Sequence, residues 1–230
     1  MIEIQNLSKA FDEHVVLNRV TLTIQTGETM VIIGRSGCGK SVLLKHIIQL
    51  MVPDEGSILI DGTEMTTVSG PALDAMRKKF GMVFQGAALF DSMTVGENVA
   101  FPLREHTTLD PSAIQQRALE CLALVGLEGV EELSPSDLSG GMRKRAGLAR
   151  ALAMSPEIIL YDEPTTGIDP IMGAVINELI IALRDRLKVT SIVVTHDMRS
   201  AYKVADRIAM LYNGAIVEVG TPDQIRQSAH

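Results

Sequence analysis

The sequence predicts an α/β fold built around a parallel or mixed sheet, to which an antiparallel β subdomain and a helical insertion are added. Three short runs are almost wholly apolar, which indicates strands buried on both faces, as in a parallel sheet. Segments with helical periodicity lie between these runs, and this alternation is typical of an α/β domain. The buried strands are expected at 81–84, 158–161 and 191–195, and the helices at 42–50, 71–79, 112–125, 141–153, 171–187 and 198–205.

The two added parts carry different patterns. Residues 2–7 and 15–24 alternate apolar and polar side chains, which indicates antiparallel strands with one exposed face. The stretch from about 86 to 154 has helical periodicity and no convincing strand, which indicates a helical insertion. The remaining elements are expected at 57–60, 207–212, 215–219 and in a short helix after Pro222.

Length and composition indicate one folded domain over residues 1–230. With 46% hydrophobic residues, a chain of this length can bury a sizeable core. We expect about 1–85 and 155–230 to form that core, and about 86–154 to form a helical subdomain inserted into it.

The net charge and the lengths of the apolar stretches indicate which classes of partner the chain can bind directly. The net charge of −7 argues against a nucleic-acid-binding face. The N-terminal residues lack the basic and apolar regions of a secretory signal, and no apolar stretch approaches the ~20 residues that cross a bilayer. We therefore expect a soluble chain that meets a membrane only through a partner. Cys38 and Cys121 are too few for a disulfide framework or a metal site and suit a reducing compartment.

A glycine-rich segment at residues 34–41, GRSGCGKS, directly follows the apolar run 29–33. The strand–loop–helix order and the Gly-x4-Gly-Lys-Ser spacing predict a phosphate-binding loop, and with it a P-loop nucleoside triphosphatase core. The glycines let backbone N–H groups face one phosphate, and the dipole of the following helix attracts the same anion. Lys40 is expected to reach the β- and γ-phosphates, and Ser41 to bind Mg²⁺ through its hydroxyl. The expected nucleotide contacts here are Gly34, Arg35, Ser36, Gly37, Cys38, Gly39, Lys40, Ser41 and Val42.

The apolar strand at 158–161 is followed by two carboxylates, Asp162 and Glu163. At the C-terminal end of a parallel strand, Asp162 is expected beside the phosphate loop, where it would hold Mg²⁺ directly or through water. Consecutive side chains of a strand point to opposite faces, so Glu163 is expected away from the metal, in a place to polarise an attacking water. A solvated acidic turn is the alternative, and the phosphate loop upstream argues against it.

A second phosphate-binding surface is expected at Ser139, Gly140 and Gly141, where the helix predicted at 141–153 begins. One chain cannot easily fold two such surfaces onto one γ-phosphate. The sequence therefore predicts a head-to-tail homodimer in which each chain completes the site of the other.

With these motifs in this order, the sequence resembles the ATPase subunits of ATP-binding cassette (ABC) transporters over essentially the whole chain. The resemblance matches residues 34–41 to the Walker A loop, 138–142 to the signature motif, and Asp162 and Glu163 to the Walker B aspartate and the catalytic glutamate. It implies the ABC ATPase fold, binding of ATP and Mg²⁺, and an integral membrane permease as partner.

The resemblance also implies roles for residues outside these motifs. Gln85 matches the Q-loop glutamine, which senses Mg²⁺ and couples to the permease, and Asp169 lies in the D-loop. His196 matches the histidine that contacts the γ-phosphate, and Phe11 falls where an aromatic side chain stacks on adenine. Together these matches imply catalytic roles for Glu163, His196, Gln85 and Lys40, and Mg²⁺ binding by Ser41, Gln85 and Asp162.

Several positions have a second interpretation or depart from the family pattern. Phe11 could be a core aromatic, and His196 a structural histidine, although its spacing favours the γ-phosphate contact. Cys38 is expected to be a small filler, with a redox switch as the alternative. Met142 replaces the usual glutamine of the signature, and Arg35 stands where proline is common. Because the signature serine and its backbone donors remain, hydrolysis is expected to survive.

Residues 86–106 and Met142 carry a narrower resemblance, to the ATPases of phospholipid transporters that work with mammalian-cell-entry (MCE) domain proteins, the Mla-like systems. It implies phospholipid transport between inner and outer membranes, an MCE-domain lipid-binding partner, and a peripheral place on the cytoplasmic face of the inner membrane. Two alternatives stay open. One is an ATPase that serves an importer of a small polar solute. The other is a soluble cassette ATPase acting on DNA or ribosomes, although the long coiled-coil insertion or second cassette usual in that class is missing here.

The helical insertion contains more apolar positions than a small core needs. Some are expected to line a groove next to Gln85 that receives a short cytoplasmic helix of the permease. The alternative is that all of them pack inside the insertion. The candidates are Leu89, Phe90, Met93, Val95, Val99 and Phe101.

Overall fold

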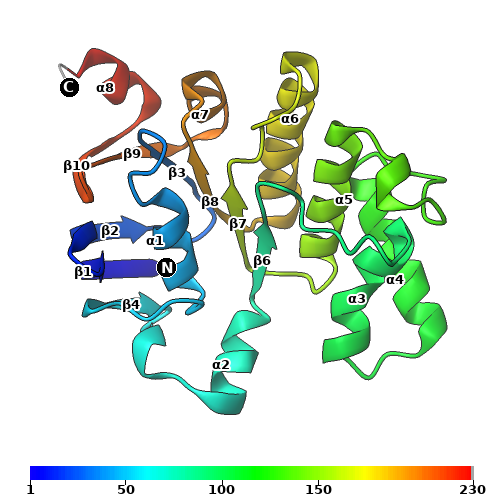
Figure 1. Cartoon of the computed structure of the whole chain (residues 1–230). Helices are drawn as coiled ribbons and strands as arrows, with labels where there is room; N and C mark the ends of the chain where they lie inside the picture. The colour runs from blue at the N-terminus through cyan, green and yellow to red at the C-terminus, as the bar shows by residue number, and fades with distance from the viewer. Residues whose placement is uncertain (229–230) are drawn as a thin grey trace.

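A six-stranded sheet forms the centre of the structure, a computed structural model that describes residues 1–228 (Figure 1). Its strand order is β10-β9-β3-β8-β7-β6, and all neighbours are parallel except β10, which is antiparallel to β9. The strands are β3 (Thr29–Ile33), β6 (Phe80–Val83), β7 (Ile158–Asp162), β8 (Thr190–Thr195), β9 (Arg207–Tyr212) and β10 (Ala215–Gly220). β3, β7 and β8 are buried along their whole length, which confirms the predicted parallel sheet.

A second sheet is antiparallel and has the order β2-β1-β4-β5. It consists of β1 (Ile2–Phe11), β2 (His14–Ile24), β4 (Glu55–Ile60) and β5 (Thr63–Glu64), of which the two-residue β5 was not predicted. Ile2, Ile4 and Leu7 of β1 are buried, whereas Gln5 and Asn6 are exposed. The sheet therefore has one face in the core and one toward water, as the alternation predicted.

Helix α1 (Lys40–Ile47) packs between the two sheets (Figure 1). Its side chains Leu43, Leu44 and Ile47 are fully buried and share one apolar cluster with residues of both sheets. The glycine loop that leads into α1 is thereby held between β3 and a rigid packed helix. This packing gives the loop a fixed position at the C-terminal edge of the larger sheet.

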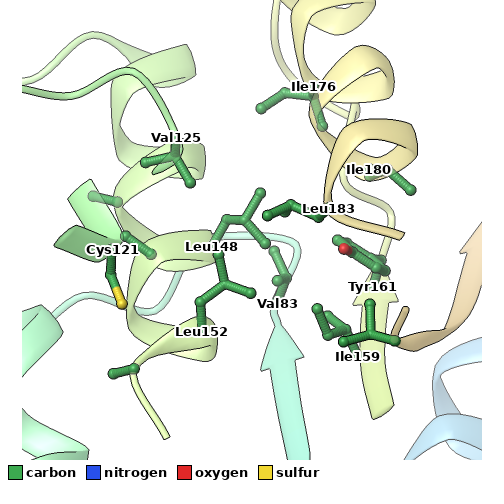
Figure 2. Packing of buried hydrophobic residues seen from close by; sticks show 14 of the residues in the cluster. Val83, Cys121, Val125, Leu148, Leu152, Ile159, Tyr161, Ile176, Ile180 and Leu183 are labelled. Carbon is green, nitrogen blue, oxygen red and sulfur yellow. The ribbon is translucent and has the colours of Figure 1, made fainter. Parts of the chain in front are cut away.

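The other face of the larger sheet is covered by α5 (Gly140–Leu152) and α6 (Pro170–Leu187). Figure 2 shows Leu148 of α5 pointing toward Leu183 of α6 and Val83 of β6. These side chains belong to one buried cluster that also includes Tyr161 of β7. Helix α5 is thus packed on the sheet as well as on the helices that precede it in the chain.

The helical region contains α3 (Val95–His106) and α4 (Pro111–Leu124), which pack against each other and against α5. Helix α3 was not among the predicted helices, because Pro102 within it lowers helix propensity. A capping box offsets this: Thr94 accepts from the backbone N–H of Glu97, and Glu97 accepts from that of Thr94.

Short elements complete the fold. They are η1 (Met65–Thr67), α2 (Gly70–Arg77), η2 (Pro135–Asp137), α7 (Met198–Val204) and α8 (Pro222–Gln227). Within residues 1–228, no helix combines the length and the apolar character needed to cross a membrane.

Candidate active site

The glycine loop adopts a backbone that requires glycine. Gly39, the N-cap of α1, has φ of +102°, and Gly37 has φ of +79°. A Cβ atom at Gly39 would lie 3.0 Å from the carbonyl oxygen of Val16 on β2. The loop is therefore pressed against the antiparallel sheet at this point, and its backbone N–H groups can turn toward one anion.

Lys40 places its ammonium group inside the loop. Its Nζ donates to the carbonyl oxygens of Gly34 at 2.8 Å and Arg35 at 3.1 Å, and the side chain is only 5% exposed. The same Nζ lies 3.5 Å from Oε1 of Glu163. A cation held at this place by main-chain oxygens can meet the charge of a triphosphate in the loop.

Ser41 and Asp162 bring the start of α1 to the end of β7. The Oγ of Ser41 donates to Oδ1 of Asp162 at 2.7 Å. A hydroxyl and a carboxylate are ligands that Mg²⁺ accepts, with water and phosphate oxygens in the other positions. Within residues 1–228, no group of three or more histidine, cysteine or acidic side chains could hold a metal by itself. The pair therefore suits an ion that arrives with a phosphate.

Glu163 follows Asp162 with a left-handed backbone, at φ of +48°, and is 8% exposed. Its carboxylate points to other partners than Asp162 does. Nδ1 of His196 lies 2.9 Å from Oε2 of Glu163. The same oxygen accepts from Thr166 Oγ1 at 3.1 Å, Thr195 Oγ1 at 3.3 Å and the backbone N–H of His196 at 3.3 Å.

The pKa of Glu163 is lowered from its ordinary value. Burial alone would raise this pKa, but the hydrogen bond from His196, the charge of Lys40 and the Thr166 hydroxyl outweigh it. The carboxylate is therefore ionised at neutral pH, which suits a group that orients or deprotonates a water molecule.

Lys40, Ser41, Glu163 and His196 border one open pocket of about 390 Å³, whereas Asp162 lies behind Ser41 and is not in its lining. Its lining consists of Phe11, His14, Val16, Ser36, Gly37, Gly39, Lys40, Ser41, Val42, Gln85, Glu163 and His196. Phe11 is 41% exposed at the rim, so the interpretation as a core aromatic is wrong. His14 and Val16 were missed, because they reach the pocket through β-sheet packing and belong to no motif. Gly34, Arg35 and Cys38 are in the loop but not in this lining.

Four further predicted contacts, at the starts of α5 and α6, also lie outside the pocket. Ser139 caps α5 by accepting from the N–H of Met142 at 3.3 Å, and Gly140 and Gly141 follow it in the first turn. Asp169 caps α6, accepting from the N–H groups of Ile171 and Met172 at 3.0 Å each. Neither helix start contributes to the lining of the pocket at the glycine loop.

An apolar groove of about 480 Å³ lies beside the segment that follows β6. It is lined by Phe80, Gly81, Met82, Phe84, Ala88, Phe90, Phe101, Pro102, Arg150, Ala151 and Met154. The prediction of groove positions is wrong for Val95 and Val99, which are fully buried. Leu89 and Met93 are half-buried and do not line the groove. The residues from β6 and α5 were missed because only the fold brings them to this face.

The sequence from 17 to 166 matches the family model described as ABC transporter. The chain belongs to this family. The matched range includes the phosphate loop, the acidic end of β7 and the helix start capped by Ser139, and the family prediction is confirmed. The fold is the ABC ATPase fold.

Curated relatives cover nearly the whole chain. The probable ribonucleotide transport ATP-binding protein mkl of Mycobacterium tuberculosis is 47% identical over 219 residues, which is 95% of this chain and 61% of that protein. The chain thus spans about three fifths of the length of the mkl relatives. The intermembrane phospholipid transport system ATP-binding protein MlaF of Haemophilus influenzae is 42% identical over 228 residues, covering 99% of this chain and 86% of MlaF.

A solved structure supports the same assignment. The ATP-binding cassette MJ0796, in a dimeric post-hydrolysis state bound to ADP and Pi, has a TM-score of 0.88 and 35% sequence identity. The match covers 96% of this chain and 99% of that one.

Proposed function

We propose that the chain is the ATP-hydrolysing subunit of an ABC transporter that moves phospholipid between the inner and outer membranes. The observation that carries the ATPase assignment is the pocket in which Lys40, Ser41 and Glu163 meet around the glycine loop. The similarity to MlaF over 99% of the chain supports phospholipid as the cargo.

Hydrolysis in this proposal is an in-line attack of water on the γ-phosphate. The ionised Glu163 orients the water or takes its proton, and His196 and Lys40 stabilise the charge that develops on the phosphate. Ser41, Asp162 and Gln85 would hold Mg²⁺. The chemistry that the ion would supply there is positive charge to stabilise the triphosphate.

The proposed site is shared between two copies of the chain. Ser139, Gly140, Gly141 and Asp169 lie outside the pocket of their own chain, so a second copy in head-to-tail orientation would supply them. The dimeric state described for the similar cassette MJ0796 supports this arrangement. Binding of ATP would close the dimer, and hydrolysis with product release would reopen it.

A permease and an MCE-domain lipid-binding protein are the proposed partners, and they place the chain peripherally on the cytoplasmic face of the inner membrane. The groove lined by Phe90 and Phe101 supports the permease contact, because an exposed apolar surface beside the Q-loop fits the apolar side of a short helix. Nucleotide state and groove shape would then be coupled through Gln85.

Import of a small polar solute is the second candidate. The names of two relatives favour it: mkl is named for ribonucleotide transport, and the cysA protein of Cucumis sativus, 43% identical over 227 residues, for sulfate or thiosulfate import. The two candidates differ in cargo and not in the chemistry of ATP hydrolysis.

The deciding experiment is purification of the native complex, followed by identification of its subunits and bound molecules by mass spectrometry. The proposal expects a permease, an MCE-domain protein and co-purifying phospholipid. Deletion of the gene should also sensitise the outer membrane to detergent and change its phospholipid content. A complex with a polar-solute-binding subunit and no lipid would replace the phospholipid assignment by the second candidate.

A further inference from the structure

Lys144 on α5 joins two segments that are far apart in the sequence. Its Nζ donates to the carbonyl oxygen of Gln85, two residues after the end of β6, and to that of Glu163 at 3.3 Å. The residue is 7% exposed. One buried ammonium group therefore contacts the main chain of the Q-loop glutamine and of the proposed catalytic glutamate at once.

The ammonium group of Lys144 has no carboxylate within 4.0 Å among the described residues. Burial lowers the pKa of Lys144, while the more distant charges of Glu163 and Asp162 oppose this effect. Burying a cation without a directly paired anion lowers the stability of the fold, so stability alone does not explain a lysine at position 144. The cost is understandable if the cation has to hold main-chain oxygens in place.

Both segments have strained backbones that need such support. Glu163 has φ of +48°. In the segment 85–88, which we call the Q-loop, Ala87 and Ala88 have φ of +63° and +51°. Non-glycine residues in this region persist where the surrounding contacts hold them, and they are common at functional sites.

The same face of α5 holds the rest of the Q-loop. Arg150 donates to the carbonyl oxygens of Ala87 at 2.9 Å and Ala88 at 2.7 Å. Between the two cations, a Cβ atom at Gly147 would lie 3.1 Å from the carbonyl oxygen of Ala87. The spacing of three residues from Lys144 to Gly147 to Arg150 keeps them on neighbouring turns of one face.

We propose that Lys144 is a positioning residue that ties the Q-loop to Glu163, so that the orientation of the catalytic carboxylate depends on where α5 holds the loop. Arg150 and Gly147 fix the loop on α5, and Lys144 extends this contact to the end of β7. A shift of the residues that line the apolar groove, which include Ala88 and Arg150, would then change the position of Glu163 through Lys144. This inference rests on the proposed role of Glu163 in ATP hydrolysis.

The test is steady-state ATP hydrolysis by the purified full chain. Lys144→Met keeps an unbranched side chain and removes the donors. Since small misplacements of reacting groups can lower rates by up to about a hundredfold, we expect kcat to fall by at least about tenfold and KM for ATP to stay within about threefold. Lys144→Arg, which keeps donors at this place, should recover part of kcat.

Arg145→Met is the matched control. Arg145 is the next residue of α5, and it donates to carbonyl oxygens of Val125 and Gly126, away from the Q-loop. We expect this variant to lower the melting temperature at least as much as Lys144→Met does, with kcat within about twofold of the wild type. Should Lys144→Met not fold, Lys144→Leu, which also lacks side-chain donors, carries the test with the same criteria.

Two results would overturn the inference. One is a kcat within about twofold of the wild type in Lys144→Met, or in Lys144→Leu if that variant carries the test. The other is an equal loss of kcat in Arg145→Met, because it would reduce the effect to general destabilisation. A wild-type chain that does not hydrolyse ATP would remove the proposed ATPase function and the inference together, whereas an active wild type with an active Lys144→Met removes only the inference.

Discussion

Nδ1 of His196 lies 2.9 Å from Oε2 of Glu163, although the His196 side chain is 54% exposed and that of Glu163 only 10%. The histidine therefore reaches from the open pocket to a carboxylate that is mostly withdrawn from water. This contact is the first of those that lower the pKa of Glu163 against the effect of burial. The proposed base is thus held both ionised and oriented by a residue that directly follows β8, the strand next to β7.

Replacing Glu163 by glutamine should separate binding from hydrolysis. Glu163→Gln keeps the size of the side chain and removes the negative charge, so turnover should fall by about a hundredfold or more while ATP affinity stays near normal. Dimers should accumulate with ATP in analytical ultracentrifugation. Lys40→Ala is the contrasting variant and should lose both binding and hydrolysis. A Glu163→Gln chain with wild-type turnover would exclude Glu163 from the mechanism.

Removing His196 should change the acid side of the pH profile. In the wild type, the pKa of Glu163 lies below its ordinary value of 4.5, so the carboxylate remains ionised until the pH falls through that lowered pKa. In His196→Ala the effect of burial remains while the hydrogen bond is lost, so the pKa of Glu163 should rise.

The measurement is kcat/KM against pH, with each profile scaled to its own plateau. Scaling separates the pKa effect from the loss of the proposed phosphate contact, which lowers the plateau itself. We expect the acid limb of His196→Ala to lie at higher pH than that of the wild type. Superimposable limbs would show that His196 does not control the ionisation of Glu163.

Mixing two inactive chains should test the shared site. Lys40→Ala damages the glycine loop, and Ser139→Arg fills the second phosphate-binding surface. In a head-to-tail mixed dimer, both changes fall in one site and the other site is intact. In an equal mixture with random pairing, about half of the dimers are mixed and each of these keeps one of two sites. Partial ATPase activity is therefore expected on mixing, up to about a quarter of that of the wild type if the sites act independently. Full activity of the wild-type monomer at any dilution would contradict the model.

Part of the active site could be predicted because its residues lie at the C-terminal ends of apolar runs that are recognisable as buried parallel strands. The loop from Gly34 to Ser41 follows a strand directly, and Asp162 ends another, so parallel pairing alone brings them to one edge. His14 and Val16 could not be found in this way. They belong to a different sheet, and they reach the pocket because the glycine loop packs against β2.

The helical region could be predicted only coarsely. Its helical character is evident in the apolar periodicity, but α3 contains Pro102 and depends on a capping box and on packing. Lys144 stands in the sequence as one of three successive basic residues, which usually indicates a solvated face. Its burial follows from the contact of α5 with the Q-loop, and no local signal marks that contact.

The groove beside the Q-loop should be required for permease binding. Phe90 is 43% exposed and packs on Phe101, with ring centroids 5.0 Å apart. Phe90→Asp would place a charge on an apolar surface, so it should reduce co-purification of the permease by about tenfold or more while basal ATPase activity stays within about twofold. Leu109→Asp is the matched control, because Leu109 is 48% exposed and lies outside the groove. Equal loss of the permease in both variants would remove the groove from the interface.

Asn98 supports the position of Phe90 from within α3. It is fully buried, its Oδ1 accepts from the N–H of Phe90 at 2.7 Å, and its Nδ2 lies 2.9–3.3 Å from the carbonyl oxygens of Phe90, Met93 and Thr94. Asn98→Ala would leave these main-chain groups without their partner, which should cost about 2–4 kcal/mol of the free energy of unfolding, measured with urea. Asn98→Asp keeps the acceptor for the N–H of Phe90 but places a carboxylate oxygen beside the three carbonyl oxygens, so it should be no more stable than Asn98→Ala.

If the segment entering α3 sets the shape of the groove, Asn98→Ala should also weaken permease binding at temperatures where the chain remains folded. A stable Asn98→Ala with normal permease binding would show that this network is not needed to present Phe90.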